Sequence, residues 1–323
     1  MIPTVSVIIV FYEGLDKLFY CIDSLMNISF DLKRIELIIV NNSTTSIDIS
    51  DTTRSRFHRM ILVSPGFNSG YAGGNNFGYA QSQGEFVFFL NPDVFLEPNA
   101  LEGTISALVR HPDWGAAMGK LLHYDWNMRA STTVIDSVGL IVKWNYRGFD
   151  RGQREQDNGQ FSNGESIDAI SGAAFFCRRS ALQDIYHKDG YIFDESFFAY
   201  KEDVDLSIRL RNMGYDLRYL PILFGYHCRT WAARRKRGEV SVFTRYHSFK
   251  NRYLLIAKHM SLMSFLLSLP LMALQEFALL IYIHIFETDI KSAYRKVIKD
   301  ATVIVGTRFL RAIGVPKHTG KRI

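Results

Sequence analysis

The chain has 323 residues, of which 47% are hydrophobic and 22% are charged, so it carries enough apolar residues to form a core. This composition excludes an intrinsically disordered chain. The three cysteines, Cys21, Cys177 and Cys228, form no CxxC pair, which excludes a disulfide framework and a cysteine-based zinc site.

Charged residues are distributed unevenly along the chain, although the formal net charge is only +6. Residues 1–228 contain 20 basic and 27 acidic residues, a balance of −7, whereas residues 229–323 contain 18 basic and 5 acidic residues, a balance of +13. We therefore expect the two parts of the chain to meet different partners. The first residues, Met1 to Val5, lack the basic stretch and cleavage site of a secretory signal, which predicts a cytoplasmic location.

Buried strands and helices alternate over the first 110 residues. Short apolar runs rich in β-branched and aromatic residues predict strands, and apolar residues at helical spacing predict helices between them. The predicted strands are 5–11, 35–40, 60–63 and 86–90, and the predicted helices are 15–26, 72–82 and 100–110. This alternation predicts an α/β fold with a mostly parallel central sheet flanked by helices.

Polar segments follow three of these strands at the point where each strand ends. They are the segment beginning at Asn41, the glycine-rich segment 65–76, and Asn91-Pro92-Asp93. Ligands of parallel sheets gather at the carboxyl ends of the strands, so these segments predict one polar rim around a binding site.

Two of these segments have both a functional and a structural interpretation. Segment 65–76 contains neither a dinucleotide fingerprint nor a P-loop, but Gly70 lets the backbone approach a ligand, and Asn68 and Asn75 can bind ribose hydroxyls. The alternative is a tight turn from strand to helix. Asp93 can bind a divalent cation together with nucleotide phosphates, or it can cap the following helix.

An acidic group starts a further predicted helix. Glu202, Asp203 and Asp205 precede apolar residues at helical spacing, and neighbouring carboxylates raise one pKa into the range of a general base. The alternative is a helix start that acidic side chains stabilise through the helix dipole. His227 follows a short apolar stretch, and a lone histidine is more often structural than a ligand. Residues 143–166 lose the apolar pattern, which predicts a long loop or lid.

The order of these segments resembles that of family 2 glycosyltransferases with the GT-A fold, and within that family of bacterial rhamnosyltransferases. The resemblance extends from residue 5 to about residue 252, which predicts a catalytic domain over 1–252 and a C-terminal helical region over 253–323. The segments that carry it, apart from the first strand, Asn41 and His227, are NSGYAGGNN (68–76), NPD (91–93), SGAAFFCRRSAL (171–182) and FDESFFAYKEDVDLSIRLRNMGY (193–215).

The resemblance implies a role for several residues of the site. Asp93, beside Asn91, stands where the family holds Mg²⁺ or Mn²⁺ against the donor diphosphate, and His227 is a candidate further ligand. Asp203 stands at the position of the catalytic base, with Glu202 as the competing candidate. Asn68, Gly70 and Asn75 would line the nucleotide pocket. Asn41 stands where the family usually has an aspartate that contacts the donor base, so the base preference is open.

The expected reaction is inverting, metal-dependent transfer of rhamnose from dTDP-rhamnose to a lipid-linked oligosaccharide in cell-surface polysaccharide synthesis. A UDP-sugar donor is one alternative, and a non-catalytic membrane scaffold with the same fold is another. A nucleotidyltransferase would need a basic nucleotide-binding loop near the N-terminus, which residues 11–14 do not provide.

The C-terminal part combines an apolar region with basic residues. Lys258, Pro270, Gln275 and Glu276 interrupt the apolar stretch 254–286, so we expect two helices broken near Pro270 or Gln275. The basic run 234–237 and the basic tail suit anionic lipid better than nucleic acid. We therefore expect peripheral attachment to the cytoplasmic face of the cell membrane, with a packed core or homo-oligomer interface and a spanning segment as alternatives.

Overall fold

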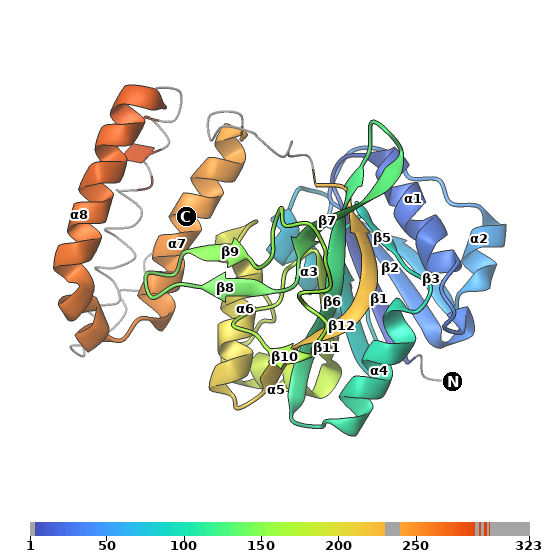
Figure 1. Cartoon of the computed structure of the whole chain (residues 1–323). Helices are drawn as coiled ribbons and strands as arrows, with labels where there is room; N and C mark the ends of the chain where they lie inside the picture. Colours follow the sequence, from blue (N-terminus) through green and yellow to red (C-terminus); the bar gives the residue numbers. More distant parts are fainter. Residues whose placement is uncertain (1–3, 230–239, 288–290, 292–293, 296, 298–323) are drawn as a thin grey trace. The chain divides into compact units, whose positions relative to one another are not determined.

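The computed structural model describes residues 4–229, 240–287, 291, 294–295 and 297 (Figure 1). The chain divides into a first unit of residues 1–142 and 148–230 and a second unit of residues 143–147 and 231–323. The expected boundary between residues 252 and 253 differs from this division, because it falls inside helix α7 (Val242–His259) of the second unit.

The first unit is built on a mixed sheet with the strand order β10-β12-β6-β11-β4-β1-β2-β3. The four predicted strands form its parallel half, because β1 pairs in parallel with β2 and β4, and β2 pairs in parallel with β3. Their bounds are β1 Val5–Phe11, β2 Ile35–Asn41, β3 Arg59–Val63 and β4 Phe86–Leu90. The predicted strands are therefore confirmed.

The other half of the sheet corrects the expectation of a mostly parallel sheet. There β12 pairs in parallel with β6, but β11 pairs antiparallel with β4 and β6, and the short strands β5, β7 and β10 also pair antiparallel. The bounds are β5 Val94–Leu96, β6 Trp114–Asp125, β7 Ala130–Ser137, β10 Glu165–Ser166, β11 Ala174–Arg178 and β12 Asp216–His227. Pairing between distant segments sets strand direction, and local apolar patterns do not encode it.

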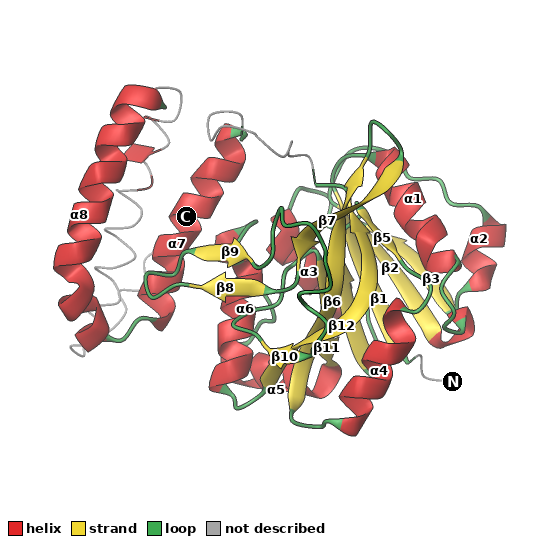
Figure 2. Ribbon diagram, in the orientation of Figure 1, coloured by secondary structure: helices red, strands yellow, loops and turns green. Residues whose placement is uncertain are grey.

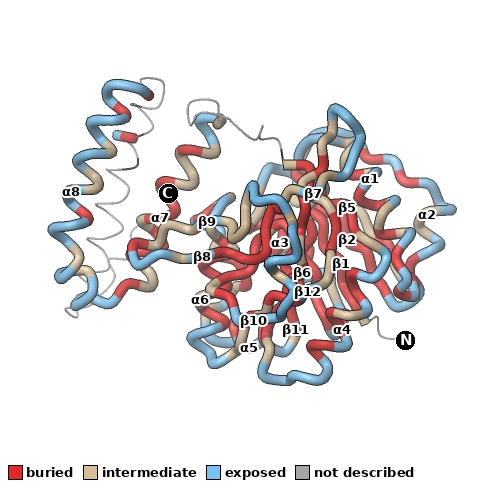
Figure 3. The backbone as a smooth tube through the Cα atoms, in the orientation of Figure 1, coloured by how far each residue is buried: buried red, intermediate tan, exposed pale blue. Residues whose placement is uncertain are grey.

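Helices cover both faces of this sheet, with α1 and α2 on one face and α3 and α6 on the other (Figure 2). The central strands β1, β2, β4 and β11 are almost wholly buried, and the buried aliphatic and aromatic side chains of this unit form one core (Figure 3). The helices are α1 Leu15–Met26, α2 Asp51–Arg56, α3 Gly70–Ala80, α4 Ala100–Arg110, α5 Arg179–Asp189 and α6 Glu202–Asn212, with 3-10 turns at Leu32–Arg34 and Glu195–Phe197.

The segment expected to be a long loop is partly a β-hairpin. Strands β8 (Leu140–Val142) and β9 (Gly148–Asp150) pair antiparallel, and residues 143–147 form the connection between them. This hairpin could not be predicted from the sequence, because its strands have only three residues each and are too short to show an alternating pattern.

The second unit contains α7 and α8 (Leu262–Phe286). The expected break near Pro270 or Gln275 is wrong: α8 continues through both residues, and the chain turns instead at Ser261, whose side chain caps α8 by accepting from the Ser264 N–H. A proline removes one helical hydrogen bond, but the leucines and other strong helix formers that follow it sustain the helix. The basic run 234–237 and residues 298–323 of the tail lie outside the described residues.

Within the described residues, α8 is the one helix that is long and apolar enough to cross a membrane. Its mean hydropathy reaches 1.8 over an 18-residue window, and only 11% of that window is buried. A core helix of a soluble protein with this hydropathy would be mostly buried, so the exposed apolar surface of α8 needs another explanation.

Candidate active site

Asp93 and His227 lie side by side at the edge of the sheet where β4 and β12 end. His227 is the last residue of β12 and pairs with Val94 of β5, so the backbone register brings it next to Asp93. The His227 Nε2 atom lies 3.3 Å from Asp93 Oδ1, and the Cys228 N–H donates to the Asp93 carbonyl at 2.8 Å. The two residues proposed as metal ligands are thus adjacent in space.

A second layer of charged residues supports His227. Its Nδ1 atom lies 2.8 Å from Asp136 Oδ2, and the Asp136 side chain is fully buried. Arg229 extends this layer, with its Nε 3.6 Å from Asp136 Oδ1 and its Nη1 2.6 Å from Asp150 Oδ2. Sequence reasoning missed these three residues because they belong to no motif: Asp136 lies in β7, Asp150 in β9 and Arg229 two residues after β12.

The charges in this group stabilise one another. Burial alone would raise the pKa of Asp93, but the facing His227, together with Lys17 and Arg229, holds that pKa below its usual value. Burial alone would lower the pKa of His227, but Asp93 and Asp136 raise it to about 9. At neutral pH Asp93 is therefore a carboxylate and His227 an imidazolium.

The donor chemistry of this pair fits a divalent cation. A carboxylate oxygen and an imidazole nitrogen are common ligands of Mn²⁺, and the Asp136 carboxylate behind the ring fixes which nitrogen faces the ligand position. No group of three or more His, Cys, Asp or Glu side chains gathers around one position in the described parts of the chain. Substrate phosphates commonly complete such sites.

Asp203 and Glu202 occupy the first turn of α6, as the sequence predicts. The two carboxylate oxygens of Asp203 accept from the backbone N–H groups of Gly172 and Val204, each at 2.8 Å. Burial raises the pKa of Asp203, although these two donors oppose the shift. Burial and the neighbouring Asp203 raise the pKa of Glu202 well above its usual value, and Glu202 Oε2 has no hydrogen-bond partner among the described residues.

The chain that leads into α6 has an unusual backbone. Phe198, Tyr200 and Lys201 have φ values of 64°, 70° and 70°, in the left-handed region that residues other than glycine rarely adopt. Such conformations persist only where surrounding contacts hold them. One of these contacts is the hydrogen bond from the Ala72 N–H to the Phe198 carbonyl at 3.1 Å.

A short backbone segment connects the Asp203 and Asp93 regions. The Gly172 N–H donates to Asp203, and the carbonyl of the next residue, Ala173, accepts from the Asn91 N–H at 2.9 Å. The Tyr71 hydroxyl donates to the Gly172 carbonyl at 2.6 Å. The structure therefore brings both predicted carboxylates to the same edge of the sheet.

The predicted nucleotide-binding residues form hydrogen bonds within their own turns. Asn41 accepts from the Ser43 N–H and donates to the Thr45 carbonyl, and Asn68 accepts from the Gly70 N–H at 3.0 Å. Buried Asn75 donates to the Tyr71 carbonyl one helical turn earlier. The contacts of Asn68 and Asn75 agree with the structural interpretation of segment 65–76 as a turn from strand to helix. Nucleotide contact by these residues and by Asn41 stays a prediction.

Asn42 is a residue of this rim that sequence reasoning overlooked. Its buried side chain donates to the Gly70 carbonyl at 2.7 Å and accepts from the Ser69 hydroxyl at 3.0 Å. It therefore joins the end of β2 to the start of α3. The signal was present in the sequence as the second asparagine of an Asn-Asn pair after an apolar strand.

The sequence is similar to those of known and probable glycosyltransferases. The probable glycosyltransferase YdaM of Bacillus subtilis is 24% identical over 225 residues, covering 68% of this chain and 49% of that protein. The low-salt glycan biosynthesis hexosyltransferase Agl10 of Haloferax volcanii is 22% identical over 263 residues, covering 79% of this chain and 76% of that protein. The chain thus spans about half the length of the first of these relatives.

Solved structures share the fold at low sequence identity. Staphylococcus aureus TarS 1-349 in complex with UDP-GlcNAc has a TM-score of 0.53 and 17% identity, covering 80% of this chain and 68% of that chain. GalNAc-T7 with UDP, GalNAc and Mn²⁺ has a TM-score of 0.57 and 12% identity, covering 79% of this chain and 48% of that chain. The first unit therefore has a GT-A-like α/β fold.

The family model "Glycosyl transferase family 2" matches residues 6–186, more than half of the chain. The matched residues include all of β1 but its first residue, the glycine-rich start of α3 and Asp93. This protein belongs to glycosyl transferase family 2.

Proposed function

We propose that this protein is an inverting, metal-dependent glycosyltransferase that works in polysaccharide biosynthesis. Asp203 accepts the proton of an acceptor hydroxyl, whose oxygen attacks the anomeric carbon of a nucleotide sugar. The new carbon–oxygen bond forms as the bond to the diphosphate breaks, and the nucleoside diphosphate leaves. The overall reaction requires no oxidant and no further co-reactant.

The observation that supports this proposal is that the pKa values of two carboxyl groups at one edge of the sheet are shifted in opposite directions. His227 holds Asp93 ionised, whereas burial raises the pKa of Asp203. Environments that push two pKa values apart separate a charged binding group from a group that exchanges protons. These opposite shifts suit a site in which Asp93 holds a metal ion and the diphosphate, while Asp203 removes a proton from the acceptor.

Asp203 is a better base than Glu202 on geometry. Asp203 is partly exposed, and each of its oxygens already has a backbone donor that fixes its orientation. Glu202 is buried and belongs to the interior behind the site. A proton acceptor must be reachable by the substrate, so we assign the base to Asp203 and keep Glu202 as the alternative.

We assign Asp93 and His227 as the residues that would hold Mg²⁺ or Mn²⁺. Enzymes with the GT-A fold typically use such a divalent ion, and when bound it would neutralise charge on the departing diphosphate. The imidazolium proton of His227 must leave for Nε2 to become a ligand, and Asp136 keeps the opposite nitrogen oriented in either state.

For the donor we propose dTDP-rhamnose, on the basis of the resemblance to rhamnosyltransferases. A UDP-sugar is the second candidate, and the similar TarS structure holding UDP-GlcNAc supports it. The Asn41 side chain is engaged in its own turn and does not decide between the two bases. Competition by free nucleoside diphosphates separates them: stronger inhibition by UDP than by dTDP would reject dTDP-rhamnose and leave the transferase proposal intact.

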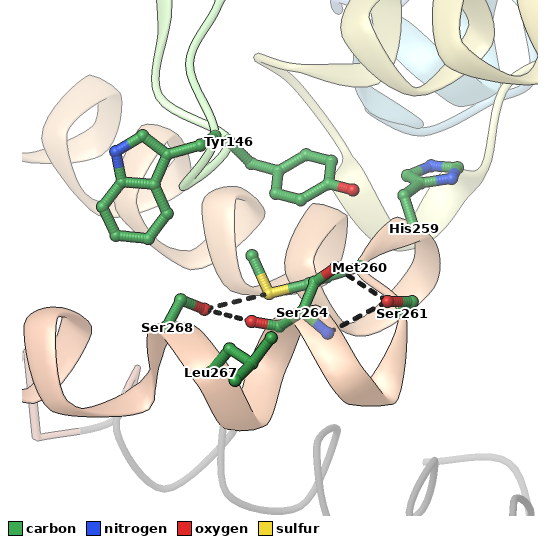
Figure 4. Close-up of a pocket in the computed structure, with 8 residues that line it drawn as sticks. Tyr146, His259, Met260, Ser261, Ser264, Leu267 and Ser268 are labelled. Carbon is green, nitrogen blue, oxygen red and sulfur yellow. Dashed lines mark hydrogen bonds between the residues drawn. The ribbon is translucent and has the colours of Figure 1, made fainter.

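We propose further that the acceptor is lipid-linked and that the second unit docks on the cytoplasmic face of the cell membrane. Exposed apolar side chains of α8, such as Leu267, Leu274 and Phe277, support this location. A cavity of about 530 Å³ at the start of α8 has Tyr146, His259, Met260 and three serines in its wall (Figure 4). Aromatic and histidine side chains over apolar surface suit the membrane interface.

A donor-turnover assay tests the proposed function against the scaffold alternative. We expect the purified full chain to release nucleoside diphosphate from a nucleotide sugar with Mn²⁺, and EDTA to abolish this release. Asp93→Ala should remove activity, whereas Asp157→Asn, which alters an ion pair with Lys120 that touches neither Asp93 nor Asp203, should not. A well-folded wild-type chain that binds no nucleotide sugar and turns none over would support the scaffold.

A further inference from the structure

Four aromatic rings pack together beside the strand that follows Asp93. They are Tyr20 of α1, Phe95 of β5, Tyr124 near the end of β6 and Trp126 in the turn after β6, with ring centroids 4.8–6.4 Å apart. Phe95 and Tyr124 are buried, whereas Tyr20 is 44% exposed. We call these four residues the aromatic cluster. Its buried rings anchor the exposed ones.

Two cations lie against this cluster. The Arg129 guanidinium carbon is 3.5 Å from the centroid of the Trp126 ring and 5.8 Å from that of Tyr20, and Lys17 Nζ is 5.7 Å from the Trp126 centroid. In the part of the chain that the structure describes, neither cation has a carboxylate within 4.0 Å. Cation–π attraction therefore positions two positive charges that form no salt bridge with a described carboxylate.

The turn that presents Arg129 has an unfavourable backbone conformation. Arg129 has a φ of 51°, in the left-handed region that side-chain-bearing residues rarely adopt. Asp125 holds the turn, since its Oδ1 accepts from the N–H groups of Asn127 and Met128 at 3.0 and 3.1 Å. The turn therefore fixes the backbone from which the Arg129 guanidinium lies over the Trp126 ring.

These cations lie close to the candidate metal site. Phe95 of the aromatic cluster is two residues after Asp93, and α1 packs against β5 (Figure 1). Lys17 lies in the first turn of α1, the helix that packs against β5. An anion bound between Lys17 and Arg129 would therefore lie next to the group proposed to hold the metal.

We propose that Lys17 and Arg129 bind a phosphate group of a substrate beside Asp93. The planar guanidinium can donate two parallel hydrogen bonds to phosphate oxygens, and the ammonium adds a compact point charge. The inference rests on the proposed function, which supplies two sources of this chemistry: the diphosphate of the nucleotide donor and a phosphate within the acceptor. Trp126 acts as a positioning residue that holds both cations.

The test compares Lys17→Met and Arg129→Met with Arg110→Met, a control that removes an exposed cation from the end of α4. With Mn²⁺ present, we expect each site variant to lose affinity for UDP and dTDP by about tenfold to a hundredfold, while uridine and thymidine bind as before. Arg129→Lys should restore part of the loss, because it keeps the charge without the planar fork.

The outcomes separate the two phosphate sources and the two proposals. Unchanged nucleoside diphosphate affinity with a raised KM for the acceptor alone would support the site and assign the phosphate to the acceptor. Wild-type affinities and KM values for both substrates in both site variants would overturn the site while leaving the transferase proposal standing. A wild-type chain that binds no nucleoside diphosphate would overturn the proposed function, and this site with it.

Discussion

At the scale of single residues, Asp203 combines exposure to the site with a raised pKa. Its side chain is oriented by the Gly172 and Val204 N–H groups, so replacement by asparagine should keep the shape of the site and remove the base. We expect Asp203→Asn to lower kcat by roughly 10² to 10⁴ with donor affinity nearly unchanged. Equal loss in Glu202→Gln with an active Asp203→Asn would transfer the role to Glu202.

The same carboxyl group sets an expected pH dependence. Burial raises the pKa of Asp203 above that of an ordinary aspartate, so the protonated, inactive form persists to higher pH. A base works only when deprotonated, and activity should therefore fall as pH decreases through this raised pKa. A profile of kcat/KM against pH measures it. An acidic limb at the pKa of an ordinary exposed aspartate would contradict the assignment.

Asp136 should matter although it touches no substrate. It orients His227 and pairs with Arg229 while fully buried, so Asp136→Asn removes one of the two carboxylates that each cation faces and leaves only Asp93 and Asp150. We expect Mn²⁺ affinity to fall by about 10-fold to 100-fold and the free energy of unfolding to fall by about 1–3 kcal/mol. Metal titration and urea unfolding measure the two effects. Asp157→Asn is the control, and a metal affinity equal to that control would refute the role of Asp136.

At the scale of elements, the start of α3 depends on one glycine. Gly70 has a φ of 71°, and a Cβ atom there would lie 2.4 Å from the Phe198 carbonyl oxygen. Gly66 is the matched control, with a φ of 82° but no atom within 4 Å of a Cβ. Both alanine variants should lose about 1 kcal/mol from the left-handed backbone, and Gly70→Ala should lose about 1–3 kcal/mol more from the clash.

The clash at Gly70 also has a functional consequence. The Phe198 carbonyl belongs to the segment that leads into α6, so displacing it should misplace Asp203 and lower kcat. Thermal unfolding and a turnover assay, run on Gly70→Ala and Gly66→Ala together, separate strain from clash. If the two variants had equal stability and equal activity, segment 198–201 would be able to move away from the added methyl group without any cost to folding or turnover, and the prediction would be wrong.

The elements differ in how far the sequence could predict them. Strands such as 35–41 are rich in β-branched and aliphatic residues, so local patterns were enough to predict them. The position of Asp93 after β4 and of Asp203 in α6 followed in the same way. The antiparallel strand β11, the short hairpin of β8 and β9, and the contact of Asp136 with His227 depend on pairing between distant segments, which a local pattern does not contain.

The wrongly predicted break near Pro270 or Gln275 shows a second limit of prediction from local sequence. The break was predicted from the residue types of Pro270 and Gln275 alone. In the structure the turn lies at Ser261, whose hydroxyl caps α8 by accepting a hydrogen bond from the Ser264 N–H. The Ser261 cap satisfies an N–H of the first turn of α8, and the strong helix formers around Pro270 sustain the helix through it. A search for capping residues would have found the turn.

At the scale of the whole molecule, charged contacts between α7 and α8 argue against a spanning role for α8. Glu276 lies near the middle of α8 and bonds to Arg252 and to the Tyr253 hydroxyl, and Arg245 pairs with Glu287 at 3.1 Å. A spanning α8 would carry Glu276 to the bilayer centre, where charged side chains are costly. Docking with the apolar face down leaves these pairs intact.

Membrane binding of the full chain should therefore have two separable components. The balance of +13 from residue 229 onward attracts anionic lipid, and salt screens this term, whereas burial of the exposed face of α8 is insensitive to salt. We expect flotation with anionic liposomes to weaken only in part at high salt. The double variant Leu274→Ser with Phe277→Ser should weaken it at every salt concentration.

A matched control and an extraction assay complete this prediction. Val109→Ser with Tyr186→Ser removes exposed apolar surface from the first unit and should leave flotation unchanged, because those side chains lie outside the docking surface. Carbonate should release the docked protein, since a peripheral helix keeps its polar face in water. Release by detergent alone would show that α8 spans the bilayer despite Glu276, and equal flotation of both double variants would reject α8 as the docking surface.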